Sequence, residues 1–150
     1  MAIHIEDLMT LAHALLELPM ESAWRASISR SYYAVHLRAL DWEIEQHIDG
    51  LNIGHPGGLH QQLINRLRNP SRPIPLRIRQ RAALLACHLE IQRDRRVDAD
   101  YRLSLSITLA DARQQFNQAR EALNGCNLPP RARRQDNAKS DAARNAIGRS

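Results

Sequence analysis

One stretch of the chain, from Ser22 to about Ile48, contains no helix-breaking Gly or Pro. Small residues crowd this stretch, so a neighbouring helix should approach it closely. The spacing predicts one long helix, closed by Asp49-Gly50. Its apolar residues recur in steps of three or four, as on the buried face of a helix: Ala23, Ala26, Ile28, Tyr32, Val35, Ala39 and Trp42.

The composition argues against a fold built on sheets. Phe, Tyr and Trp make up only 4% of the 150 residues, and β-branched residues are sparse beside Ala, Leu and Arg. Strands would therefore lack the side chains that they prefer. The length suits one domain. We expect a single all-α domain over residues 1–128.

Four further helices are predicted from apolar spacing and from end signals. A Gly-rich loop at 50–58 and a Pro-rich run at 69–75 separate the short helix from its neighbours, and the polar segment 95–106 is expected to connect the last two. Thr108 and Asp111 have the spacing of a capping box, and Gly125 is the expected helix stop. The predicted helices cover 4–18, 59–67, 76–96 and 108–124.

The basic charge is concentrated in two blocks. Twenty Arg and one Lys stand against sixteen acidic residues, for a net charge of +5. Residues 66–96 hold nine Arg and two acidic residues, whereas residues 1–65 carry a net charge of −5. Clustered Arg side chains are typical of phosphate-binding surfaces, which points to nucleic acid. The alternative is that these Arg residues line solvated helix faces and pair with the acidic first half.

The last residues, 129–150, have almost no large apolar side chain and a net charge of +4. Such a segment cannot offset the entropy of ordering, so we expect a disordered basic tail. No run is long and apolar enough to cross a bilayer, and the first ten residues do not resemble a secretory leader. With two cysteines and no sign of an oxidising compartment, a cytoplasmic location away from membranes is expected.

Metal and nucleotide cofactors are not expected. The histidines are scattered without a His-x3-His spacing, and the two cysteines lie far apart in the chain. A closed zinc site is therefore not predicted. The loop at 50–58 lacks the Lys-Ser/Thr ending and the preceding strand of a phosphate-binding loop. No bound cofactor is predicted from the sequence.

Two segments and one histidine carry a resemblance to a known family. The stretch 22–35, SAWRASISRSYYAV, resembles the R-x-A-I-S-R-A-Y-Y-A signature in the second helix of HEPN domains. The stretch 95–101, RRVDADY, is similar to the R-N/R-x-x-A-D-Y end of the fourth helix in one prokaryotic branch of that family. His60 stands where many members carry a histidine that opens a short helix. The resemblance spans about residues 5–124.

The resemblance implies an antiparallel bundle of four long helices and one short helix, usually a homodimer, that binds RNA. Arg30, Tyr33 and Tyr101 are expected to share hydrogen bonds with Asp98 or Asp100, because a buried Arg needs carboxylate or phenol partners. The alternative is that this network only orders the bundle. The residues implied for RNA binding or for the structural network are Arg30, Tyr33, His60, Arg93, Arg95 and Asp100.

The active ribonucleases of the family carry an R-x(4–6)-H motif at the position of residues 95–101. No His follows Arg93, Arg95 or Arg96 in this chain, which removes the usual general acid or base. For cleavage without a metal, the catalytic candidates are Arg96, Asp98 and Tyr101. The ordinary pKa values of Tyr and Asp, about 10 and about 3.9, lie far from neutrality.

Three hypotheses follow from the sequence. The first is an HEPN-like RNA-binding protein, a toxin or defence-associated ribonuclease-like module with a degenerate catalytic motif. The second is a non-catalytic subunit that partners a minimal nucleotidyltransferase antitoxin, with Tyr101 as the modification site. The third is a scaffold whose basic tail contacts nucleic acid or an acidic partner, while the bundle only dimerises.

Overall fold

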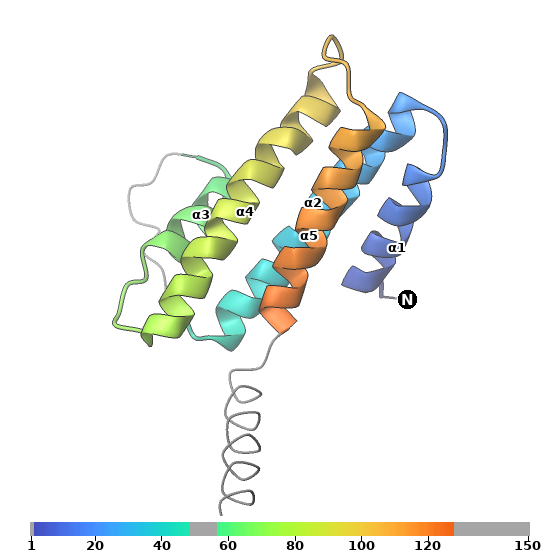
Figure 1. Ribbon diagram of the computed structural model, residues 1–150. Helices are drawn as coiled ribbons and strands as arrows, with labels where there is room; N and C mark the ends of the chain where they lie inside the picture. The colour runs from blue at the N-terminus through green and yellow to red at the C-terminus, as the bar shows by residue number, and fades with distance from the viewer. Residues whose placement is uncertain (1, 49–56, 128–150) are drawn as a thin grey trace, which may run out of the picture.

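The computed structural model describes residues 2–48 and 57–127, and within these ranges it contains helices and no strands (Figure 1). Consecutive long helices run antiparallel, and α2 packs against each of the other four. The predicted all-α bundle of four long helices and one short helix is confirmed. Most of the loop predicted at 50–58, and the tail predicted at 129–150, lie outside the described residues. The helices are α1 Ile5–Leu16, α2 Glu21–Glu45, α3 Leu59–Arg68, α4 Leu76–Tyr101 and α5 Leu109–Asn127.

Small side chains on α2 allow the close approach that the sequence predicts. Ala23, Ser27, Ser31 and Ala34 are all buried. The Ser27 hydroxyl donates a hydrogen bond of 2.7 Å to the backbone carbonyl of Ala12 on α1, which requires the two backbones to lie close together. The small residues therefore position α1 against α2.

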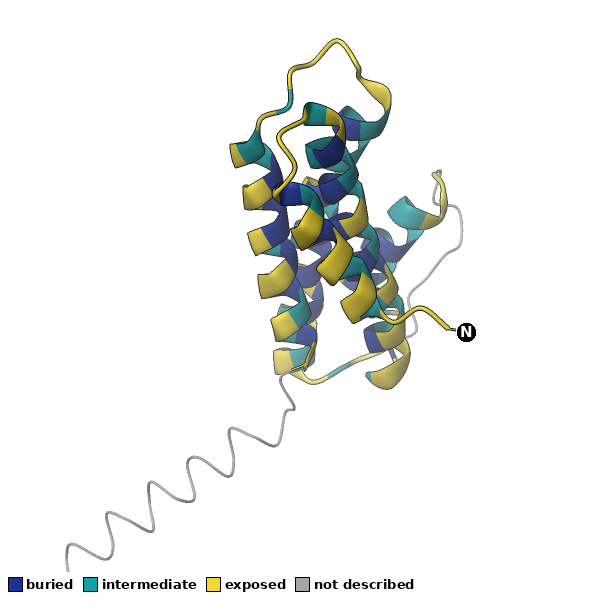
Figure 2. Ribbon diagram, turned by 90° about the vertical axis from the view of Figure 1, so that its right-hand side faces the viewer, coloured by how far each residue is buried: buried dark blue, intermediate teal, exposed yellow. Residues whose placement is uncertain are grey.

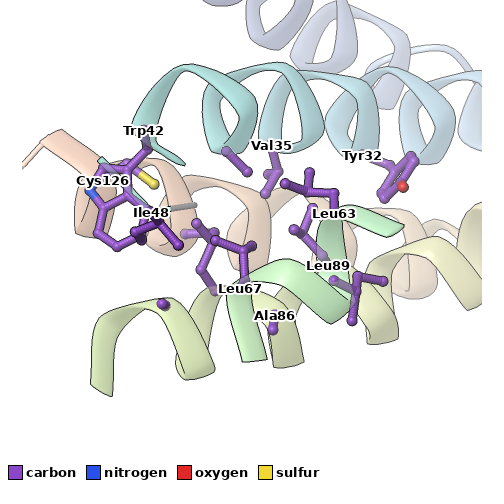
Figure 3. Close-up of a cluster of buried hydrophobic side chains, with 14 of the residues drawn as sticks. Tyr32, Val35, Trp42, Ile48, Leu63, Leu67, Ala86, Leu89 and Cys126 are labelled. Carbon is purple, nitrogen blue, oxygen red and sulfur yellow. The ribbon is translucent and has the colours of Figure 1, made fainter. Parts of the chain in front are cut away.

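The core consists of two groups of apolar side chains. The larger group joins α2, α3, α4 and α5 around Trp42, Leu63, Leu67 and Leu89, and Tyr32 lies at one end of it (Figure 3). The smaller group joins α1, α2, α4 and α5 and includes Phe116. Figure 2 shows that buried residues line the inner faces of the helices and exposed residues the outer faces. None of the described helices is both long and apolar enough to cross a bilayer.

The prediction that the fourth helix ends near residue 96 is wrong, because α4 continues to Tyr101. The extension, residues 97–101, has no regular apolar spacing, but Ala99 is only 2% exposed and Asp98 forms an ion pair of 3.1 Å with Arg102. Arg25 on α2 also donates to the carbonyls at this helix end. Because a side chain of another helix holds this helix end, the apolar spacing of the sequence does not show where the helix stops.

The two end signals of the last helix had different outcomes. The capping box is confirmed, because the Thr108 N–H donates to Asp111 Oδ2 at 2.8 Å and the Asp111 N–H donates to Thr108 Oγ1 at 3.1 Å. The predicted stop at Gly125 is wrong, since α5 extends to Asn127. Burial of Cys126 and a hydrogen bond of 3.3 Å from the Arg38 guanidinium to its carbonyl hold this last turn in helical form.

Candidate functional site

One place on the bundle gathers tyrosine, histidine and arginine side chains from three helices. These residues come from the middle of α2, the first turn of α3 and the second half of α4. Residues spaced by three or four share one face of a helix, so α2 and α4 each present their members together. The set, called the three-helix site below, consists of Tyr32, Tyr33, His36, His60, Arg93 and Arg96.

His60 is fixed by the buried phenol of Tyr32. The Tyr32 hydroxyl lies 2.7 Å from His60 Nδ1. Burial raises the pKa of Tyr32 to about 12, although Arg93 and Arg96 act in the opposite direction, so the phenol keeps its proton at neutral pH. Among the described residues that hydroxyl has no other acceptor, so it donates to Nδ1 and neutral His60 carries its own proton on Nε2.

His36 lies beneath His60 and is almost fully buried, with 8% of its surface exposed. The two imidazole rings are 4.3 Å apart between centroids. Burial lowers the pKa of His36 to about 4, and the neighbouring His60, Arg66 and Arg96 lower it further. Its Nδ1 has no hydrogen-bond partner among the described residues. His36 is therefore a neutral, buried ring that packs against the inner side of His60.

Two arginines of α4 approach the histidines. Arg93 donates a hydrogen bond of 2.6 Å to Gln61 Oε1, next to His60 on α3. Arg96 donates to the Tyr33 hydroxyl at 3.0 Å, and its Nε lies 2.9 Å from Asp100 Oδ2 in an ion pair. The Arg96 guanidinium carbon also lies 5.2 Å from the centre of the Tyr33 ring, within the range of a cation–π contact.

The electrostatics of the three-helix site favour a neutral His60. Partial burial lowers the pKa of His60, and the positive charges of Arg96 and Arg93 lower it further. Asp100 balances Arg96, and Ser29 Oγ holds that carboxylate from α2 with a hydrogen bond of 3.2 Å. No carboxylate forms a described ion pair with Arg93. The site therefore offers an arginine and a neutral N–H donor, an arrangement suited to an anion.

The network expected around Arg30 is wrong in its central residue. Arg30 is exposed on α2 and has no hydrogen bond or ion pair among the described residues, so it is not the buried arginine of the bundle. Arg96 takes that place, with 13% of its side chain exposed and Tyr33 and Asp100 as its partners. The sequence does not distinguish the two because both arginines belong to the quoted motifs.

Other predicted residues lie outside the three-helix site. Arg95 faces α5, where its guanidinium donates to the Gln118 side chain and, at 3.4 Å, to Gln115. Asp98 pairs with Arg102. Tyr101 is 68% exposed at the end of α4, and its ring centre lies 5.4 Å from the Arg96 guanidinium carbon. The predicted hydrogen bond from Tyr101 to Asp98 or Asp100 is not formed among the described residues.

Arg25 has a structural role that the sequence reasoning missed. Its guanidinium donates to the carbonyls of Asp98, Ala99 and Arg102, and to that of Leu105 beyond the helix. The last carbonyls of a helix have no partner within it, so this side chain caps α4. The sequence offered one signal for this role, because Arg25 lies within the quoted 22–35 motif although it was not placed in the expected network.

The described ranges contain no candidate metal site. There, no three side chains of the His, Cys, Asp and Glu types gather closely enough to hold an ion. His36 and His60 lie together, but cationic Arg93 and Arg96 border them. The three-helix site is therefore bordered by positive charges.

Comparison with protein-family models, with curated proteins and with solved structures finds no match to this chain. The similarity to HEPN domains therefore depends on the motifs quoted above.

Proposed function

We propose that the protein is an HEPN-like RNA-binding protein and that the three-helix site contacts the RNA backbone. The observation that carries this proposal is the convergence of His60 from α3 with Arg93 and Arg96 from α4, over a distance of more than thirty positions in the chain. An arginine fork and an imidazole N–H are complementary to phosphate oxygens.

Arg93 is the main source of attraction in this proposal. Arg96 is balanced by Asp100, whereas Arg93 makes its described hydrogen bond to a neutral amide and keeps its full positive charge. Exposed Arg30 lies one helical turn before Tyr33 on α2 and adds a second unbalanced charge nearby. The exposed ring of Tyr101 offers a surface on which a base can stack.

Binding, rather than cleavage, is the activity that we assign to the site. Of the catalytic candidates, Asp98 is paired with Arg102 and Arg96 is paired with Asp100. His60 is the partly exposed member of the site whose ordinary pKa lies near neutrality. A toxin or defence-associated ribonuclease role would therefore need His60 as its proton-transferring group.

We expect Arg93→Gln to weaken binding of a random-sequence RNA of about 20 nucleotides roughly tenfold, and to reduce the slope of log affinity against log salt by about 1. Loss of one phosphate contact is the physical reason. The matched control is Arg113→Gln, which removes one exposed charge on α5 and should change the affinity less than about twofold. Fluorescence anisotropy across a salt series measures both quantities. Equal losses in the two variants would show that only net charge matters.

The exposure of Tyr101 favours a second candidate function, as a subunit modified by a minimal nucleotidyltransferase. Its phenol oxygen would attack the α-phosphorus of a nucleoside triphosphate, lose its proton and release pyrophosphate.

We expect the chain, co-expressed with such an enzyme, to gain the mass of one nucleotidyl group, and we expect Tyr101→Phe to gain none. Intact-protein mass spectrometry measures this difference. The control is Tyr33→Phe, because the Tyr33 hydroxyl accepts a hydrogen bond from Arg96 and the side chain is half-buried. The Tyr33→Phe protein should be modified like the wild type. Modification of Tyr101→Phe would exclude Tyr101 as the acceptor.

A further inference from the structure

We propose that His60 binds the RNA phosphate as an imidazolium, so that the three-helix site takes up a proton together with its ligand. This inference rests on the proposed RNA binding and adds a property that an ordinary arginine patch lacks. Binding to the site should then become tighter as the pH falls.

The His60 ring has one free edge. Nδ1 is occupied by the Tyr32 hydroxyl at 2.7 Å, whereas Nε2 has no hydrogen-bond partner among the described residues. The ring is partly exposed, at the start of α3. Nε2 is therefore the atom available to donate to a phosphate oxygen.

The groups around His60 keep it neutral when the site is empty. From α4 it faces Arg93 and Arg96, of which only Arg96 is balanced, by Asp100. From α2 it faces the rings of Tyr32, Tyr33 and His36, and burial keeps Tyr32 and His36 uncharged at pH 7. Arg66 of α3 is paired with Glu43 at 2.9 Å. The net field is positive, so a third positive charge on the imidazole is disfavoured.

A bound phosphate reverses this balance. A phosphodiester carries one negative charge, which offsets Arg93 and attracts an imidazolium placed beside it. A hydrogen bond from imidazolium Nε2 to a phosphate oxygen is also stronger than one from the neutral ring. The charged form of His60 is therefore favoured in the complex and disfavoured in the free protein.

Tyr32 allows both forms of His60 within the same contact. A hydroxyl can donate to Nδ1 of the neutral ring and can accept from Nδ1–H of the imidazolium. The two groups therefore stay within hydrogen-bonding distance when His60 gains its proton. A carbonyl at this position could only accept, so Nδ1 of the neutral ring would have to carry the proton and Nε2 could not donate.

Proton uptake makes affinity depend on pH. Between the pKa values of the free and bound states, one linked proton changes the affinity by up to about tenfold per pH unit. The phosphodiester group does not titrate between about pH 6 and 8, which is the range where an imidazole does. The pH dependence in that range therefore reports on the protein.

The test measures binding of the same random-sequence RNA to the full chain by anisotropy, from about pH 8 to about pH 6. We expect the wild-type affinity to rise several-fold over this range and the affinity of His60→Gln to stay flat. His88→Gln is the control, because His88 lies in a groove between α4 and α5, and it should follow the wild type. Calorimetry of the wild type at one pH, in two buffers of different ionisation enthalpy, counts the protons without any variant.

The outcomes separate this inference from the proposed function. RNA binding with pH-independent affinity and equal heats in both buffers would overturn proton uptake and leave RNA binding intact. A His60→Gln protein that is folded by circular dichroism and keeps the wild-type pH dependence would assign the proton to another group. No RNA binding at any pH would overturn the proposed function, and this inference with it.

Discussion

Replacing Arg25 with methionine is expected to lower the free energy of unfolding by about 3 kcal/mol. The Arg25 side chain is 11% exposed, and its guanidinium donates to Glu21 Oε1 at 2.7 Å as well as to the carbonyls at the end of α4. Methionine fills much of the same volume but donates no hydrogen bond. The carbonyls of Asp98 and Ala99 would then lack their cap, and Glu21 would lose its ion-pair partner.

Chemical and thermal denaturation of the two proteins measure this loss, which corresponds to a decrease in Tm of about 10 °C. The matched control is Arg30→Met, a change of the same type on the same helix at an exposed position, which should stay within about 0.5 kcal/mol of the wild type. Amide exchange should also quicken in the last turn of α4. Equal stability of the two variants would contradict the capping role of Arg25.

Acidification is expected to destabilise the wild type through His36, by roughly 2 kcal/mol between about pH 7 and 4 after allowance for solvent screening. The pKa of His36 is about 4 in the folded protein, whereas an unfolded chain has the ordinary value of about 6.5. In this window the unfolded state binds more protons, so the free energy of unfolding falls as the pH falls. Stability is retained above the unfolded pKa.

The comparison uses His36→Phe, which keeps an aromatic ring beside Tyr32 and His60 but cannot take up a proton. Its urea midpoint should fall less than that of the wild type over the same pH range. His88→Gln leaves His36 in place and should show the full wild-type dependence. Parallel pH profiles for the wild type and His36→Phe would show that His36 does not resist protonation in the fold.

The helices were largely predictable from the sequence because their signals are local. The absence of Gly and Pro over 22–48, the proline after Leu18 and the capping box at Thr108 each act within a few residues. The errors arise where a distant residue decides. Arg25 extends α4 beyond residue 96, and burial of Cys126 carries α5 past Gly125. Neither contact has a signature near the helix end that it determines.

The candidate site was predictable in part. Tyr33, His60 and Arg93 were named for RNA binding or a structural network and Arg96 was named as a catalytic candidate, and the structure brings these residues together at one place. The support beneath them was not predicted, because the Tyr32–His36 pair looks like ordinary core spacing on α2. The choice between Arg30 and Arg96 as the buried arginine depends on how α2 is rotated against α4, which only the packed bundle determines.

The central claim, that RNA binds at the three-helix site, is tested most directly by nuclear magnetic resonance. Uniformly 15N-labelled full chain is titrated with the random-sequence RNA, and shifts of backbone and histidine ring resonances are followed. We expect the largest shifts in the first turn of α3, around Tyr33 on α2, and from Arg93 to Tyr101 on α4. Shifts confined to residues after 128, with the three-helix site unchanged, would contradict the claim and assign the binding to the basic tail.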